Sequence, residues 1–400
     1  NDAHGGLSTT GSMLEPAAYA IDFARERGLP LVINMSFGVG NEIEGTARID
    51  MIVDSILSVH PDLVWVISAG NEGPGLSTVG FPGSARNALT VGAIMPAAFL
   101  QGGTKAPGEP IAFFSGRGGE LAKPEIVTPG VAYSTVPAWN VGEEQSSGTS
   151  MAAPHASGLV ALLRSGLVQE GREADADEIR RALMVTARPV ADERFLEQGS
   201  GIPDIGAAWQ WLSQSHQVPD ISVNPAGGSV TDAAFRSGGL RGPGDTSQVF
   251  EIRRPAGAGT ATYRLESSAT WLSAPASVTL ADTLTRVTLR YASDALIQPG
   301  VYSGTVSAWG SDSLTGPVFR LVNTVIVPAG DSMAMDPLPI PAGGQRRFFF
   351  PADSGRPFTA IARSGESEHQ ILVFLHEPGG MPLSGGTPLA VPFGQDAAFH

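Results

Sequence analysis

The amino-acid sequence predicts an α/β domain with a mostly parallel sheet, followed by all-β, sandwich-like domains. Up to about residue 213, helical patterns alternate with short apolar runs, and this order builds a parallel sheet that helices cover on both faces. From about residue 219, apolar residues recur at every second position, as they do in half-buried strands. The 50 glycines and 31 prolines are well above average usage and indicate many tight turns between these runs.

Helices and buried strands follow one another along the first domain, for which we expect the bounds 1–213. The first helical pattern ends before Gly28, a residue that suits a C-cap. The strands are continuous apolar runs, which are typical of strands buried on both faces of a sheet. The predicted helices span residues 15–27, 49–59, 151–163 and 177–187, and the predicted strands span residues 29–37, 62–68 and 88–93.

The remaining sequence predicts two β domains. We expect a β-sandwich of the immunoglobulin or fibronectin kind over residues 217–328, because turn signals separate its alternating runs at sandwich-like spacing. A Pro-Ala-Gly break at residues 328–330 precedes a second β domain over residues 329–400, which need not be complete. The predicted strands of the two domains span residues 286–291, 301–307, 319–327, 346–350, 358–362 and 370–375.

Composition excludes several classes of function. The net charge is −14 and the sequence has no cluster of Lys and Arg, so we expect no nucleic-acid partner. The absence of cysteine removes disulfides, Cys-ligated zinc and thiol catalysis. No run of 18 apolar residues exists, so no membrane span is predicted. The histidines show no metal-ligand spacing, and no metal site is predicted from them.

The segment with the clearest chemistry surrounds Ser150, which stands directly before a helical run of small residues. A hydroxyl there lies at the positive end of the helix, where free backbone N–H groups can hold an oxyanion. Gly148 allows a tight turn and the approach of a substrate. Pro154 is expected in the first helical turn, where a missing N–H removes no helical hydrogen bond. Taken alone, Ser150 could instead be a helix cap.

Residues 148–155 (Gly-Thr-Ser-Met-Ala-Ala-Pro-His) resemble the nucleophile motif of the subtilisin family at every position. This resemblance implies a subtilisin-like three-layer domain and a serine endopeptidase that hydrolyses polypeptides without a required cofactor. Further segments resemble other landmarks of the family and follow in the family's order, namely residues 34–38, 68–73, 114–118, 123–131 and 199–204.

The resemblance also implies a role for individual residues. Ser150 would be the nucleophile, and Asn71 would donate its side-chain amide to the oxyanion, together with the backbone N–H of Ser150. Family members often bind calcium, but no Asp-rich loop places such a site in this sequence. The motif residues that support Ser150 are Gly148, Thr149 and Pro154, and the residues that would wall the pocket before the scissile bond are Ser36, Phe37, Gly38, Ser68, Ala69 and Gly70.

A finer resemblance points to the pyrolysin and tripeptidyl-peptidase II branch, and it rests on residues 73–80, 136–140 and 317–320. Tripeptidyl peptidases bind the free N-terminus of a substrate with acidic residues, whereas the aligned positions here hold Gly11 and Val39. This difference favours an endopeptidase. Because Glu42 lies nearby in the sequence, a tripeptidyl aminopeptidase stays open as an alternative.

Two motifs of the family's catalytic triad, Asp-(Ser/Thr)-Gly and His-Gly-Thr-His, precede the nucleophile in the family, and neither occurs before Ser150 in this sequence. We expect them upstream, so that the first domain is the C-terminal two-thirds of the family domain and the chain alone is nearly inactive. His4 is not expected to be the base, because too little chain separates it from Ser36. His155 follows Ser150 on the same predicted helix and is expected to be structural.

A non-catalytic protein is the alternative from another class, with the sheet as a scaffold and the β domains binding a surface or a partner. Retention of Gly148, Ser150 and Asn71 together argues against it, because a decayed site has no need for all three. The family resemblance alone implies a secreted or extracytoplasmic bacterial protein. Cleavage specificity and oligomeric state stay open.

Overall fold

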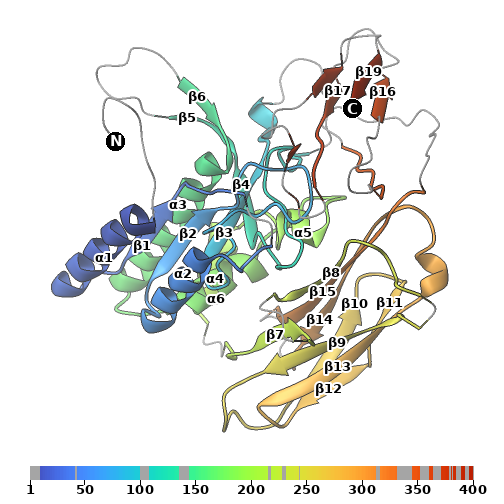
Figure 1. Ribbon diagram of the computed structural model, residues 1–400. Coiled ribbons are helices and arrows are strands. Elements are labelled where there is room, and N and C mark those ends of the chain that lie inside the picture. The colour runs from blue at the N-terminus through green and yellow to red at the C-terminus, as the bar shows by residue number, and fades with distance from the viewer. Residues whose placement is uncertain are drawn as a thin grey trace.

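The computed structural model contains a layered α/β part and a β-rich part (Figure 1). The α/β part is built from the first half of the chain, and the β-rich part from the second half. The structure describes residues 10–40, 43–99, 108–134, 144–214, 218–227, 231–242, 244–311, 316–330, 345–351, 360–363, 371–377, 380, 382–383, 389–391 and 396–399.

A parallel sheet with the strand order β1-β2-β3-β4 forms the centre of the α/β part. Strands β2 and β3 are buried along their whole length, as their continuous apolar runs predict. The strands are β1 (Val32–Met35), β2 (Val64–Ser68), β3 (Leu89–Ile94) and β4 (Ile126–Pro129).

Helices cover both faces of this sheet, because successive residues of a strand point to opposite faces (Figure 1). Trp65 and Ile67 pack with α1 and α2 on one face, whereas Val64 and Val66 pack with α3, α4 and α6 on the other. The three layers confirm the predicted α/β fold class. The helices are α1 (Thr10–Arg27), α2 (Arg48–Val59), α3 (Thr149–Gln169), α4 (Ala176–Val185), α5 (Phe195–Gln198) and α6 (Ile205–Leu212).

Helix α3 contacts all four strands of the sheet, and small side chains make this close approach feasible. Ala152, Ala153 and Ala156 of α3 are completely buried, on the side of the helix that packs with the sheet core. A glycine, Gly148, stands at its N-cap position and offers no side-chain cap, whereas α4 begins with a capping box of Asp175 and Glu178. The start of α3 is therefore not built for helix stability alone.

Strand β1 differs from its prediction. The apolar run 29–37 predicts a strand buried on both faces, but β1 covers only Val32–Met35 and Asn34 is exposed. The reason is position, because β1 lies at the edge of the described sheet while β2 and β3 lie inside it. A continuous apolar run does not distinguish an edge strand from a central one.

Two sheets of the β-rich part enclose one apolar core. Their orders are β12-β10-β14-β15-β8 and β11-β13-β9-β7, and Phe250, Leu289, Val306 and Leu321 meet between them. All pairs are antiparallel except β15 with β8. The strands are β7 (Ser222–Pro225), β8 (Ala233–Arg236), β9 (Ser247–Arg253), β10 (Ala261–Ser267), β11 (Leu272–Ser273), β12 (Ser277–Leu280), β13 (Leu284–Tyr291), β14 (Gly300–Trp309) and β15 (Pro317–Val327).

The segment after β15 contains short strand pairs, β16 with β19 and β17 with β18. The predicted strand 346–350 is wrong, because these residues have no strand pairing and instead contact other segments, such as Ala329 N, which donates to Phe349 O at 2.7 Å. Residues 358, 359 and 370 of two other predicted strands lie outside the described residues. The strands are β16 (Ala360–Arg363), β17 (Ile371–Val373), β18 (Leu389–Val391) and β19 (Asp396–Phe399).

The two-sheet unit is hydrogen-bonded to the α/β part. Ala233 N donates to Glu120 O at 3.0 Å, and Arg181 donates to Pro317 O at 2.6 Å. Leu196 of α5, with Ala233 and Val322 of the sheet, forms a small apolar cluster at this contact. The α/β part and the sandwich therefore share an interface with its own apolar and polar contacts.

Helix α3 supplies a direct test of this packing, because Leu163 is 1% exposed while its neighbour Leu162 is 63% exposed. Leu163→Ala should lower the free energy of unfolding by about 2–5 kcal/mol, since it removes buried methyl groups and leaves a cavity. Leu162→Ala should change it by less than about 0.5 kcal/mol. Urea unfolding followed by far-UV circular dichroism compares the two, and equal effects would contradict the placement of α3.

Candidate active site

The predicted site residues converge at one edge of the parallel sheet. Ser36 follows β1, Ser68 ends β2 and Asn71 lies in the loop after β2. Parallel strands have their carboxyl ends at the same edge, and helix α3 begins there with Thr149 and Ser150. The order of elements thus brings together residues that are far apart in the sequence.

Ser150 lies within the first turn of α3, since the helix begins at Thr149, two residues earlier than predicted. Its backbone N–H is one of the first four of the helix, which have no acceptor four residues earlier. Its side-chain hydroxyl donates to Ser36 O over 3.5 Å, at the limit of a hydrogen bond. The residue is half-buried, so the hydroxyl is weakly held at the positive end of a long helix.

Asn71 is oriented by the start of α3. Its Oδ1 accepts a hydrogen bond from Thr149 N at 2.9 Å. The Thr149 hydroxyl lies 3.0 Å from the same oxygen and 3.1 Å from Gly70 O. Oδ1 therefore points toward Thr149. The two N–H groups of Nδ2 point away from these donors and are available to another acceptor. The residue is exposed, so this amide can meet a ligand.

Gly148 lies between two hydrogen-bond donors, the side-chain amide of Asn71 and the backbone N–H of Ser150. Its φ of 147° lies in a region that residues with a side chain rarely adopt. A Cβ built on Gly148 would lie 3.4 Å from Asn71 Nδ2, 3.5 Å from Asn71 Oδ1 and 3.7 Å from Ser150 N, and the Oδ1 already accepts from Thr149 N. The missing side chain therefore leaves a gap that Asn71 Nδ2 and the backbone N–H of Ser150 both border. Such a pair of donors can stabilise negative charge on an oxygen.

The six residues that are expected to wall a pocket form two adjacent segments. Ser68 Oγ donates to Phe37 O at 3.3 Å, and a Cβ on Gly38 would lie 3.7 Å from Gly70 Cα. Ser36 is exposed and Phe37 and Gly38 are half-buried, whereas the segment from Ser68 to Gly70 is buried. The structure thus brings both segments to the edge where Ser150 lies.

Pro154 corrects one expectation. It is the sixth residue of α3 and so lies beyond the first turn, where its missing N–H leaves the carbonyl of Ser150 without its helical donor. The hydroxyl of Ser36 donates to this Ser150 O at 2.9 Å and replaces that hydrogen bond. Asn34 Nδ2 donates in turn to Ser36 Oγ at 3.1 Å. The sequence signal for this contact is the proline four residues after Ser150, because it predicts that Ser150 O requires a donor from outside the helix.

Glu72 lies beside the site, and the sequence patterns gave it no role of its own. Its carboxylate Oε2 lies 2.5 Å from the position of a Cβ on Gly70, and it is buried without a hydrogen-bond partner among the described residues. Burial raises the pKa of Glu72 above its ordinary value, while the backbone N–H groups of Glu72 and Asn71 partly oppose this. Its place directly after Asn71 was the available signal.

The described histidines make contacts other than with Ser150. His155 Nδ1 lies 2.8 Å from Met151 O, and His376 Nδ1 lies 2.9 Å from Gly380 O. His60 caps the end of α2 with its backbone N–H. Other positions singled out in the sequence lie outside the described residues, namely His4, Glu42, His216, His369, His400 and residues 136–140.

The described residues contain neither a candidate metal site nor a candidate membrane-spanning helix. No group of three or more His, Asp or Glu side chains in them is arranged to hold a metal ion. None of the helices in these ranges combines the length and apolarity needed to cross a membrane.

Comparison with known proteins identifies related sequences. The model of the subtilase family matches residues 4–202. Pyrolysin of Pyrococcus furiosus is 33% identical over 340 residues, which are 74% of this chain and 24% of pyrolysin. Tripeptidyl-peptidase 2 of Drosophila melanogaster is 29% identical over 349 residues, which are 81% of this chain and 24% of that protein. The chain thus spans about a quarter of the length of these relatives.

The likeness extends to a solved structure. The crystal structure of tripeptidyl peptidase 2 superposes with a TM-score of 0.70 and covers 98% of this chain and 34% of the other, at 21% identity. At 21% identity, this superposition shows that the two proteins share a fold. The shared fold includes the β-rich part as well as the α/β part.

The backbone conformation of Gly148 predicts a cost for any side chain at this position. Gly148→Ala should lower the free energy of unfolding by about 1–3 kcal/mol, because alanine is strained at this φ. Gly158→Ala is the matched control on the same helix, since a Cβ there meets open space. It should be neutral or stabilise by about 0.5–1 kcal/mol. Urea unfolding of both variants checks the prediction, and a harmless Gly148→Ala would contradict the local geometry.

Proposed function

Because this chain belongs to the subtilase family of peptidases, as its match over residues 4–202 shows, we propose that it carries the nucleophile and the oxyanion site of a serine endopeptidase. One observation supports the proposal above the others. The gap at Gly148 is bordered by Asn71 Nδ2 and by the backbone N–H of Ser150, the residue that also carries the hydroxyl. Peptide hydrolysis needs these three groups at one place.

The proposed reaction begins when Ser150 Oγ adds to the carbonyl carbon of a peptide bond and its proton passes to a base. The carbonyl oxygen becomes an oxyanion, which accepts hydrogen bonds from Asn71 Nδ2 and Ser150 N. The C–N bond then breaks, the amine leaves with the proton from the base, and an ester on Ser150 remains. Water cleaves this ester by the same sequence of steps. No cofactor takes part in this proposal.

A base and an orienting carboxylate complete the proposed mechanism. The subtilisin resemblance assigns these roles to a histidine and an aspartate. The described histidines have other contacts, His155 with Met151 O and His376 with Gly380 O. We therefore assign the base to a segment of the gene product other than the described residues. Activity is accordingly proposed for the full-length gene product.

Endopeptidase activity is favoured over tripeptidyl aminopeptidase activity by two positions. Gly11 lies in the first turn of α1 and has no side chain, and Val39 is apolar and pairs with Phe81 through its backbone. Neither offers a carboxylate to a free amino group of a substrate. The similarity to tripeptidyl peptidase 2 along nearly the whole chain keeps the aminopeptidase as the second candidate.

The substrates that we propose are polypeptides, which bind beside the segments of Ser36 to Gly38 and Ser68 to Gly70. From the family resemblance alone, we propose that the protein works outside the cytoplasm. A non-catalytic scaffold is the competing class, and the experiments below distinguish it.

The nucleophile assignment predicts covalent labelling of the full-length gene product by a fluorophosphonate. Ser150→Ala should abolish labelling and peptide cleavage, whereas Ser165→Ala, an exposed serine on the same helix, should leave both unchanged. Asn71→Ala should lower kcat by a factor on the order of 10²–10³, the magnitude known for such a donor in subtilisin itself, with little change in KM. A folded full-length protein, free of inhibitory segments, that takes no label would establish the scaffold alternative.

The two peptidase activities differ in their need for a free substrate N-terminus. We expect the full-length protein to cleave a peptide and its N-acetylated counterpart at the same internal bonds, because the described site offers no carboxylate at Gly11 or Val39. Mass spectrometry of the products reads the cleavage sites. Release of tripeptides from the free peptide alone would instead show a tripeptidyl aminopeptidase.

A further inference from the structure

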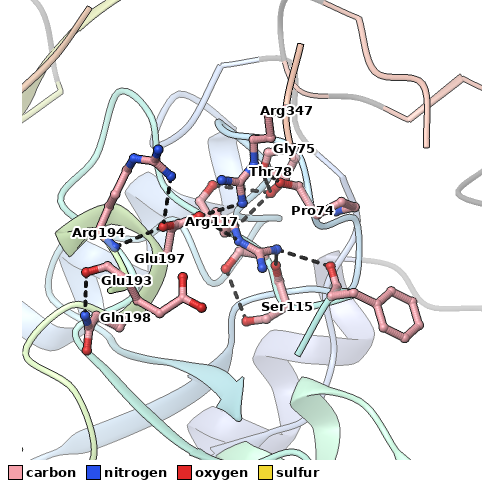
Figure 2. A network of polar contacts seen from close by, with 12 residues as sticks. Pro74, Gly75, Thr78, Ser115, Arg117, Glu193, Arg194, Glu197, Gln198 and Arg347 are labelled. Carbon is pink, nitrogen blue, oxygen red and sulfur yellow. Dashed lines mark hydrogen bonds and ion pairs between the residues drawn. The ribbon is translucent and has the colours of Figure 1, made fainter. Parts of the chain in front are cut away.

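A buried polar network joins the loop after Asn71 to the segment that follows the β-sandwich (Figure 2). It contains Arg117 of the α/β part, Glu197 of α5 and Arg347 of the segment 345–351. In Figure 2 the two guanidinium groups lie around the carboxylate of Glu197. The network is separate from the contacts of Asn71 with α3 described above.

The loop that carries Asn71 is first held within its own domain. Gly73 N donates to Phe114 O at 3.0 Å, and Thr78 N donates to Arg117 O at 2.8 Å. A side chain on Gly73 would collide with backbone of the segment 113–115, so the two segments are in close contact. The loop between Asn71 and Thr78 therefore rests on the segment around Arg117.

Arg117 fixes this supporting segment from inside. Its side chain is fully buried, and its NH1 donates to Phe113 O at 3.1 Å and to Ser115 O at 2.9 Å. Its Nε lies 3.4 Å from Glu197 Oε1. A buried guanidinium needs such partners, because burial without them is costly. The carboxylate of Glu197 offsets part of the cost of burying the Arg117 charge.

Arg347, from the segment that follows the β-sandwich in the sequence, pairs with the same carboxylate. Its NH2 lies 2.5 Å from Glu197 Oε1, and its side chain is only 12% exposed. Its Nε donates to Pro74 O at 2.7 Å, three residues after Asn71 and 273 positions away in the sequence. One guanidinium thus connects the Asn71 loop with the ion pair of Arg117 and Glu197.

The charge on Glu197 makes this connection persistent. Burial raises the pKa of Glu197, but the attraction of Arg347, Arg117 and Arg194 outweighs it and lowers the pKa to about 2. The carboxylate is therefore ionised at any pH at which the protein is expected to work. Arg347 consequently has a fixed anion to hold it beside Pro74.

The same loop has two more contacts with the C-terminal segment. A Cβ on Gly75 would lie 2.6 Å from His376 Nδ1, so the ring lies directly against the backbone of Gly75. A side chain on Gly380 would collide with Ser77 O. Three successive parts of the loop, at Pro74, Gly75 and Ser77, are therefore covered by residues that come after the sandwich.

We propose that Arg347 is a positioning residue for Asn71, so that the segment after the β-sandwich takes part in stabilising the oxyanion. The inference rests on the proposed function. Arg347 touches no reacting group and acts through Pro74 on the loop that begins at Asn71. A displacement of that loop by about 1 Å moves the amide away from the oxyanion, and displacements of this size cost up to about a hundredfold in rate.

The test uses the full-length gene product with Arg347→Met, which keeps much of the side chain's volume but removes its charge and its hydrogen bond to Pro74. We expect kcat for a peptide substrate to fall about tenfold or more, with KM changed by less than about twofold, because ground-state binding is not made by the oxyanion contacts. The affinity of a peptide aldehyde, whose oxygen occupies the oxyanion position, should fall with kcat.

A double-mutant cycle with Asn71→Ala separates positioning from general damage. If Arg347 acts through Asn71, then Arg347→Met should lower kcat by less than about twofold once Asn71 is alanine. Arg286→Met is the matched control, since Arg286 pairs with Glu251 on the exposed surface of the sandwich and should leave kcat unchanged. Independent, multiplicative effects of the two substitutions would overturn the inference.

Arg347→Lys is the second variant, in case the methionine variant does not fold. Lysine retains the charge opposite Glu197. Its single ammonium group cannot reproduce the guanidinium geometry, in which one nitrogen faces Glu197 while another donates to Pro74 O. We expect a folded protein with wild-type KM and a kcat lowered about threefold or more. A wild-type kcat in this variant would overturn the proposal. If Asn71→Ala itself leaves kcat unchanged, the proposed function fails rather than the role of Arg347 alone.

Discussion

The hydrogen bond from Thr149 N to Asn71 Oδ1, 2.9 Å long, is the constraint on which the candidate site depends. It joins the loop after β2 to the first residue of α3, and it leaves the amide nitrogen of Asn71 to face the gap at Gly148. Without this bond, rotation of the Asn71 side chain would let either its oxygen or its nitrogen face the gap. The sheet fixes where the loop starts, the helix fixes where Ser150 stands, and this bond fixes the direction of the donor between them.

The packing of helix α3 on the sheet holds the first turn of the helix, and with it the Thr149 donor of this bond, in place. Helix α3 lies close to the sheet because Ala152, Ala153 and Ala156 are small and buried, so its first turn is held at the edge where the strands end. Pro154 lacks the N–H that would bond to Ser150 O in a regular helix, and the Ser36 hydroxyl donates to Ser150 O in its place. The same side chain that borders the expected pocket therefore also completes the helix.

The sequence predicted those features that depend on local patterns. The apolar runs of β2 and β3 and the eight-residue motif around Ser150 located the sheet, the helix and the site edge. The exposure of β1 was not predictable, because an edge position depends on which strands pair with it. The Pro154 geometry required the exact start of α3, and the irregular segment 346–350 has a strand-like pattern although it makes other contacts. The contact between Arg347 and Pro74 joins residues 273 positions apart, and no local pattern encodes it.

The most direct test of the account is a crystal structure of the full-length gene product inhibited by a peptide aldehyde. The account predicts a covalent bond from the aldehyde carbon to Ser150 Oγ, with the former aldehyde oxygen about 2.7–3.1 Å from both Asn71 Nδ2 and Ser150 N. An adduct on another residue, or an oxygen that points away from Asn71 while the adduct is on Ser150, would contradict the assignment of the gap at Gly148 as the oxyanion site.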